Sequence, residues 1–226
     1  MTLLPTPTWD TFLRTVSTRT NGTWLFRGQA AKKWPLTPSA GRDQCVGSAG
    51  YRRADEYNLF KDFIREAKRY VESGFSELEW LALAQHHGLP TRLLDWSTNP
   101  LVAAWFACEK EENTDDGVVH MINVPSLDRR DDVQPFDPRL SDVALVQVPP
   151  RVGRITAQQG LFSLHPDPTA KWTPGRALRY HTLEIPGAEK PFFRQALDAF
   201  GVNRGRLMVD LDGLGATLSW KYRTRL

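Results

Sequence analysis

Apolar residues in the first half of the chain recur at the three- and four-residue spacing of helices. The clearest stretch is 51–73, where an apolar stripe that includes Phe60 and Ile64 lies opposite charged residues. Ser76 followed by Glu79 has the spacing of a capping box at a helix start. Pro100, behind a polar triplet, favours a further helix start. The pattern therefore predicts helices over about 8–18, 51–73, 76–87 and 100–110.

Strand patterns dominate the second half. They are preceded by an aromatic-rich run at 24–28 and an extended segment at 91–96. We expect a single-domain α+β fold, with a helical N-terminal half packed on a mainly antiparallel sheet. The predicted strands are 118–124, 142–148, 160–165 and 178–185, followed by helices over about 189–200 and 213–222, the last capped by Asp212.

Composition fits one domain spanning 1–226, because 41% of the residues are hydrophobic. The longest strongly apolar run, Leu101 to Cys108, is far shorter than the roughly 20 residues of a membrane-spanning helix. The two cysteines lack metal-ligand spacing, so we expect free thiols and a cytoplasmic protein. The net charge of +3 is modest and does not by itself indicate a nucleic-acid-binding surface. The oligomeric state is left open.

The segment 85–100 is the richest in candidate chemistry, because polar residues alternate there with apolar anchors. Gln85 interrupts an apolar helical stripe, so it needs hydrogen-bond partners if it is buried. His86 is a candidate acid/base or hydrogen-bonding group, or a structural histidine. Asp95 is equally consistent with a functional and a structural role.

Arg27 ends the hydrophobic strand and requires a counter-charge, which is either a ligand phosphate or an internal carboxylate such as Asp95. Gly28 after it would allow a ligand or another backbone to approach closely. Ser97 and Thr98 are either site residues or part of a helix cap. Adjacent helical histidines point apart, so no metal is expected at His86.

The sequence lacks the glycine-rich phosphate loops and the esterase and zinc-protease motifs of several common enzyme classes.

Phe26-Arg27-Gly28 and the run from Ala84 to Ala103 strongly resemble the FRG domain. Later elements also fit that family, so the resemblance extends over a core of about 20–220. These elements are Arg154-Ile155 with Gln158 and Gly160-Leu161-Phe162, then Ile185-Pro186, Lys190 and Leu211-Asp212-Gly213-Leu214.

A second, weaker resemblance is to mono-ADP-ribosyltransferases of the Arg-Ser-Glu type. It rests on the order of Phe26-Arg27-Gly28, then Trp96-Ser97-Thr98, then the helix containing Ala103, Phe106 and Ala107. The resemblance implies an ADP-ribosyltransferase-like fold and NAD as substrate. Arg27, Gly28, Gln85, Ser97 and Thr98 would then bind NAD.

The transferase-like arrangement departs from that family at its catalytic glutamate, because Gln158 and Gln159 occupy that place. A glutamine cannot neutralise a developing cation as a carboxylate does. Asp95 or Glu184 would then substitute, or His86 would carry the acid/base step. The candidate catalytic residues are therefore His86, Asp95 and Gln158. If none of them acts, the fold binds a nucleotide without turnover.

Three hypotheses follow. The first is an ADP-ribosyltransferase-like enzyme or NAD glycohydrolase, acting on a protein or nucleic-acid target as a bacterial toxin or phage-defence effector. The second is a non-catalytic nucleotide or nucleic-acid binding module. The third is a metal-independent ribonuclease toxin that uses His86 with Arg92. None of the three requires a membrane.

Overall fold

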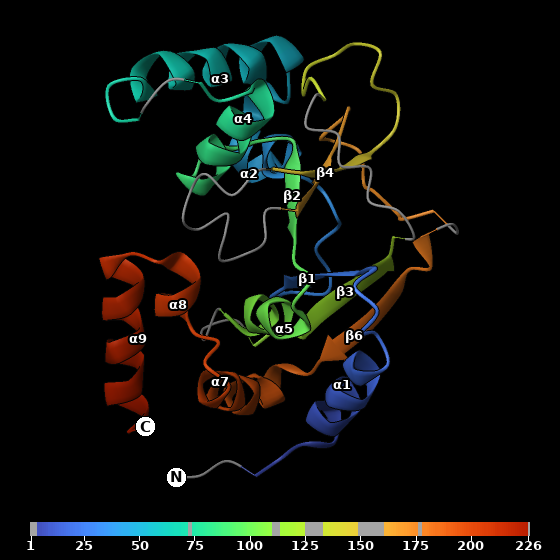
Figure 1. Cartoon of the computed structure of the whole chain (residues 1–226), viewed down its shortest axis with the longest axis vertical. Helices are drawn as coiled ribbons and strands as arrows, with labels where there is room; N and C mark the ends of the chain where they lie inside the picture. The colour runs from blue at the N-terminus through green and yellow to red at the C-terminus, as the bar shows by residue number, and fades with distance from the viewer. Residues whose placement is uncertain are drawn as a thin grey trace.

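Two small antiparallel sheets organise the chain (Figure 1). The computed structural model describes residues 4–71, 74–109, 114–124, 133–148, 161–175 and 178–225. The first sheet has the order β1–β3–β6, and the second has the order β2–β5–β4. All four strand pairs are antiparallel. The strands are β1 (Trp24–Gln29), β2 (Leu93–Trp96), β3 (Gly117–Asn123), β4 (Ala144–Gln147), β5 (Leu161–Leu164) and β6 (His181–Ile185).

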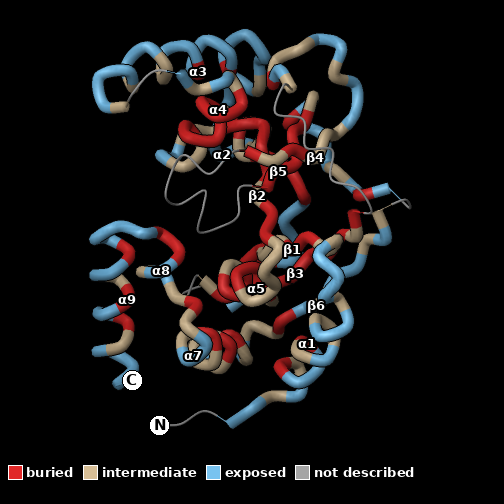
Figure 2. The backbone as a smooth tube through the Cα atoms, in the orientation of Figure 1, coloured by how far each residue is buried: buried red, intermediate tan, exposed pale blue. Residues whose placement is uncertain are grey.

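Helices cover one face of the first sheet, where residues of β1 and β3 are buried (Figures 1 and 2). Successive residues of a strand point to opposite faces of the sheet. Phe26 and Gly28 therefore face the helices, and Arg27 and Gln29 face the other way. Gly28 is required here, because a Cβ on it would lie 1.8 Å from the carbonyl oxygen of Ala103. The covering helices are α1 (Pro7–Ser17), α5 (Pro100–Cys108) and α7 (Lys190–Ala199).

The second sheet packs against two helices of the first half. They are α3 (Arg53–Ala67) and α4 (Glu77–His86), which share an apolar cluster with β2, β4 and β5. The predicted capping box opens α4, because Ser76 and Glu79 each accept a hydrogen bond from the other's backbone N–H. These contacts make the upper part of the molecule in Figure 1.

The two sheets meet where β1 passes the end of β2. Phe26 and Ser97 exchange two backbone hydrogen bonds, each 2.8 Å long. A third apolar cluster, which includes Leu25, Trp96 and Ile122, fills the space between the sheets. The end of β1 is therefore held against the end of β2, and the residues at these two ends share one environment.

The single-domain α+β prediction and the antiparallel pairing are confirmed, with three differences. The strands form two sheets, and each sheet takes one strand from the first half. Asp210, not Asp212, caps the last helix, because its carboxylate accepts from the N–H of Gly213 at 2.6 Å. The short helices α2 (Asp43–Val46) and α8 (Arg204–Met208) were not predicted, and the last helix is α9 (Leu211–Thr224).

Within the described residues, no helix combines the length and the apolar character needed to cross a membrane.

Candidate functional site

Arg27 lies at the junction of the two sheets with only part of its hydrogen-bonding capacity used. Its side chain is 13% exposed. Nη1 donates to the backbone oxygen of Asp95 at 2.8 Å and lies 3.5 Å from that residue's Oδ2. Nε is buried and has no hydrogen-bond partner among the described residues. A buried guanidinium with an unused donor is costly unless a ligand completes it.

Gln85 fixes the carboxylate of Asp95. Its Nε2 donates to Oδ1 of Asp95 at 2.6 Å, while its Oε1 accepts from the hydroxyl of Thr91. The partners expected for a glutamine on an apolar stripe are therefore present. The Asp95 side chain remains 47% exposed, so a carboxylate held from two sides still faces outward.

A second guanidinium, that of Arg42, contributes to the same electrostatic environment. Its Nε donates to the backbone oxygen of Thr37 at 2.9 Å. Burial lowers the pKa of Arg42, and the charge of Asp95 opposes that change. Burial also lowers the pKa of Arg27, which Asp95 raises and Arg42 lowers further. Asp95 is paired with Arg27, and the charge of Arg42 acts on both groups, so the added positive charge suits an anion.

A small cavity of about 90 Å³ opens beside Arg27 and Asp95, between β1, β2 and the start of α5. Pockets that enclose a whole small ligand are typically about 300–1,000 Å³, so this one has room for one group of a ligand only. Its lining residues include Arg27 and Asp95, together with the apolar residues Val102, Ala103 and Phe106 of α5.

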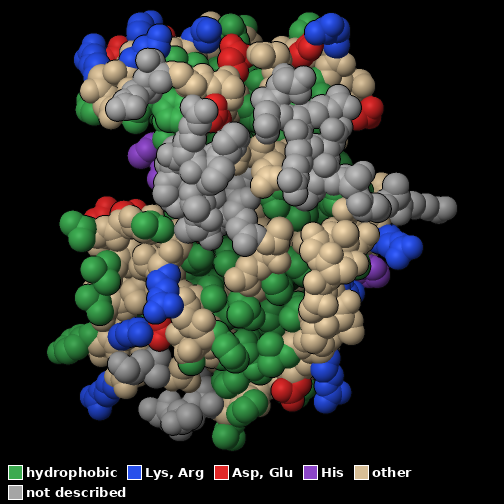
Figure 3. Space-filling view, in the orientation of Figure 1, with side chains coloured by type: hydrophobic (Ala, Val, Ile, Leu, Met, Phe, Trp, Pro, Cys, Tyr) green, Lys and Arg blue, Asp and Glu red, His purple; other side chains and the backbone are tan. Residues whose placement is uncertain are grey.

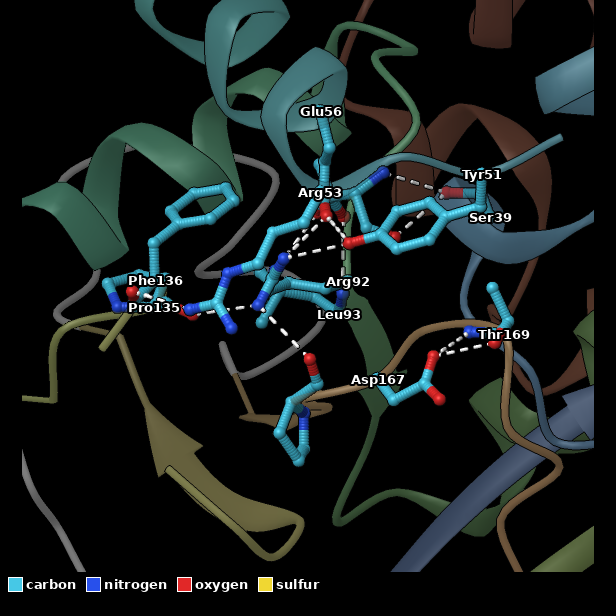
Figure 4. Close-up of polar contacts among 12 residues, drawn as sticks. Ser39, Tyr51, Arg53, Glu56, Arg92, Leu93, Pro135, Phe136, Asp167 and Thr169 are labelled. Atoms are coloured by element: carbon cyan, nitrogen blue, oxygen red, sulfur yellow. Dashed lines mark hydrogen bonds and ion pairs between the residues drawn. The ribbon is translucent and has the colours of Figure 1, made fainter. Parts of the chain in front are cut away.

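Arg92 differs from Arg27 in every respect that matters for ligand binding. Its side chain is fully buried, and all three of its nitrogens are hydrogen bonded. Figure 4 shows Glu56 and Tyr51 converging on the guanidinium. The Phe136 ring lies 4.2 Å from it. An RNA phosphate cannot reach this group. Arg92 therefore cannot take the part in RNA cleavage that the ribonuclease hypothesis gave it.

His86 is the last residue of α4, and its ring lies edge-on to that of His87 with 4.7 Å between centroids. Consecutive helix residues project about 100° apart, so His86 does not share the direction in which Gln85 reaches Asp95. The described residues contain no group of three or more histidine, cysteine or acidic side chains that could hold a metal ion.

Ser97 and Thr98 lie in the turn that leads into α5. Asn99 caps that helix by accepting from the N–H of Leu101 at 2.9 Å, and the hydroxyl of Ser97 accepts from the N–H of Asn99. The polar triplet thus has a structural role, while Ser97 also lines the cavity. Gln158, with Gln159 and the Arg154-Ile155 pair, lies outside the described residues.

Two buried histidines near Arg27 were not among the predicted site residues. His120 lies opposite Arg27 in the β1–β3 register and is hydrogen bonded to Gln29 and Tyr180. His165 is hydrogen bonded to Ser163. Burial lowers the pKa of each to about 4, and the charge of Arg27 adds to this, so both are neutral at pH 7. In the sequence they stand alone on different strands, which gives no signal of their convergence.

Comparison with known proteins gives one match. The family model for the FRG domain matches residues 22–116. No curated protein and no solved structure matches the chain. The matched range contains β1, β2 and α5, and with them Arg27, Gln85 and Asp95.

Proposed function

We propose that the region matched by the FRG-domain model, residues 22–116, binds an anionic nucleotide through Arg27, and that the protein acts on NAD or a related nucleotide as an ADP-ribosyltransferase-like enzyme. The observation that carries the proposal is the contrast between the two buried arginines. Arg92 has a partner for every nitrogen, whereas Arg27 is nearly as buried and its Nε has no partner among the residues that the structure describes. In such a protein the activity would serve as a toxin or a phage-defence effector.

Arg27 and Arg42 supply the anion-binding part of the site. A phosphate oxygen of the nucleotide accepts from Nε of Arg27, the donor without a partner among the described residues, and the charge of Arg42 adds to the attraction. The 90 Å³ cavity takes the group bound by Arg27, and the rest of the nucleotide lies outside it. This arrangement favours a ligand whose phosphate is bound in the cavity while its glycosidic bond stays outside.

Asp95 supplies the carboxylate that the reaction requires. The bond between nicotinamide and ribose breaks, nicotinamide leaves with the bonding electrons, and positive charge develops on the ribose. Water, or a nucleophile of the target, then bonds to C1′ of the ribose and gives up its proton to solvent. Asp95 is adjacent to Arg27 and half exposed, and Gln85 fixes its orientation. Glu184 lies on the same sheet face two strands away from Gln29, but it is paired with Lys32 at 2.9 Å. We therefore assign the role to Asp95 before Glu184.

The proposal is tested with purified protein, NAD and ADP-ribose. Calorimetric titration measures binding, and chromatography measures nicotinamide release with candidate targets present. We expect Arg27→Gln to abolish binding, and Asp95→Asn to retain binding and lose release. Arg65→Gln, an exposed arginine on α3, is the matched control and should behave as wild type. Absence of binding by the wild type, or binding unchanged in Arg27→Gln, overturns the proposal.

A second candidate is a module that binds the same ligands without turnover. It is favoured by the glutamines at 158 and 159, and by the hydrogen bonds that already occupy both oxygens of Asp95. In this case NAD or short RNA binds, Arg27→Gln still abolishes binding, and no preparation releases nicotinamide. The Asp95→Asn variant then differs from wild type in neither assay.

A further inference from the structure

Helix α9 carries an apolar stripe on the side that faces away from the protein. Its inner residues Gly213, Thr217 and Trp220 are buried. Its outer stripe is the set Leu211, Leu214, Leu218 and Tyr222, exposed by 83, 47, 57 and 86%. Figure 2 shows the two sides of the helix, and in Figure 3 hydrophobic side chains protrude at the molecule's edge beside α8 and α9.

The spacing of this outer stripe is that of a helix–helix contact. The intervals of three, four and four residues place all four side chains on one face. Single exposed apolar residues are common on protein surfaces, but a continuous row along one helix marks an interaction surface. The row is as long as the helix, whose 14 residues extend about 21 Å.

Gly215 lies within the same outer face. A Cβ on it would meet nothing within 4 Å, and its φ is not in the left-handed region, so neither packing nor backbone conformation in this chain requires glycine. A glycine inside a helix is less stable than alanine by about 1 kcal/mol. A residue without a side chain on an outward face allows another helix to approach closely.

The charges of α9 identify the orientation of the helix that would approach. Asp210 and Asp212 lie at its N-terminal end, and Lys221, Arg223 and Arg225 at its C-terminal end. An antiparallel second copy brings opposite charges together at both ends, whereas a parallel copy brings like charges together. The helix macrodipoles also favour the antiparallel arrangement.

The two-fold register follows from the positions of the stripe. If Leu211 of one copy lies opposite Tyr222 of the other, then Gly215 lies opposite Leu218, and Asp212 lies level with Lys221. A leucine therefore meets the position without a side chain. The aspartate lies level with Lys221, which is already paired with Asp198 of its own chain at 2.8 Å. One stripe is complementary to itself, as a two-fold interface requires.

From these observations we propose that two copies of this chain associate through the outer faces of α9, antiparallel and two-fold symmetric. A single pair of 14-residue helices buries less than the roughly 1,600 Å² of a standard interface. The dimer is therefore weak and depends on protein concentration, with micromolar dissociation. It does not depend on nucleotide binding at Arg27, which lies on β1.

Sedimentation velocity over a concentration series tests association. The wild type should shift from monomer to dimer as concentration rises, and Leu218→Glu should remain monomeric with an unchanged circular dichroism spectrum. Leu59→Glu, at a 43% exposed leucine on α3, is the control and should dimerise as wild type. A wild type that stays monomeric up to its solubility limit overturns the proposal, as does dimerisation unaffected by Leu218→Glu.

Disulfide trapping tests the register. In a Cys45→Ser background, which removes the exposed native thiol, Leu211→Cys and Tyr222→Cys chains are mixed and oxidised. The antiparallel pair predicts mainly mixed disulfides between positions 211 and 222. Disulfides joining 211 to 211 and 222 to 222 instead would show parallel packing and refute the proposed arrangement.

Discussion

Substituting methionine for each buried arginine should separate a residue that stabilises the fold from one that binds a ligand. Arg92→Met removes the counter-charge of Glu56, whose side chain is 5% exposed. Removing one partner of a buried ion pair typically costs about 3–5 kcal/mol, because the other charge stays buried. For a chain of this size each kcal/mol lowers Tm by about 2–4 °C, so we expect a decrease of roughly 6–20 °C.

Arg27→Met should change stability little. The variant loses one charge-assisted hydrogen bond to the backbone oxygen of Asp95, a contribution of about 1.5–3 kcal/mol. It also removes a guanidinium that is 13% exposed and whose buried Nε has no partner in the described part of the chain, and this offsets most of that loss. The net change in unfolding free energy should be within about 1 kcal/mol of zero, while nucleotide binding is lost.

Urea unfolding followed by tryptophan fluorescence measures both variants, since the chain has eight tryptophans. Circular dichroism on the same samples checks that the transition has two states. The reasoning is refuted if Arg27→Met loses as much stability as Arg92→Met, or if Arg92→Met loses less than about 1 kcal/mol. A Glu56→Leu/Arg92→Met double variant should regain most of the stability, because no buried charge is left alone.

Three further outcomes are expected. Burial holds the pKa of His120 and His165 at about 4, below the unfolded value, so stability is complete above about pH 6.5 and decreases toward pH 4. The urea midpoint should fall over that range by the equivalent of about 2–3 kcal/mol per histidine, and a constant midpoint would contradict this. Gly28→Ala should destabilise the protein by at least 1–3 kcal/mol in the same assay, because its Cβ would overlap the backbone of α5, and a neutral effect would contradict that packing. Burial raises the pKa of Cys108 to about 12, so iodoacetamide at pH 8 should modify Cys45 alone, as mass spectrometry of the folded protein will show; labelling of both thiols would contradict the burial.

Local signals in the sequence located most elements of the fold. The capping box at Ser76 and Glu79 is confirmed because both of its hydrogen bonds depend on residues three apart. The helices α2 and α8 were missed because four and five residues are too few to show a helical period. Asp210 and Asp212 are chemically equivalent as caps, and only the extended backbone of Asp210 distinguishes it.

The site was harder to predict because its contacts depend on strand register. Gln85, Asp95 and Arg27 were each recognisable as polar residues in apolar surroundings, and their contacts bring them together. His120 gave no such signal, because it lies opposite Arg27 only through the pairing of β3 with β1. A single sequence does not fix that pairing.

Arg27 and Arg92 show why residue type alone cannot assign a role. Both are arginines in or next to a strand with buried apolar residues, and both are largely removed from solvent. The difference lies in α3, which places Glu56 against Arg92 and places no carboxylate at similar depth against Arg27. Natural stability tends to sit near the minimum that function allows, so a buried charge left incompletely paired indicates a requirement other than folding. The unused donor of Arg27 is therefore the feature of this fold that a bound anion best explains.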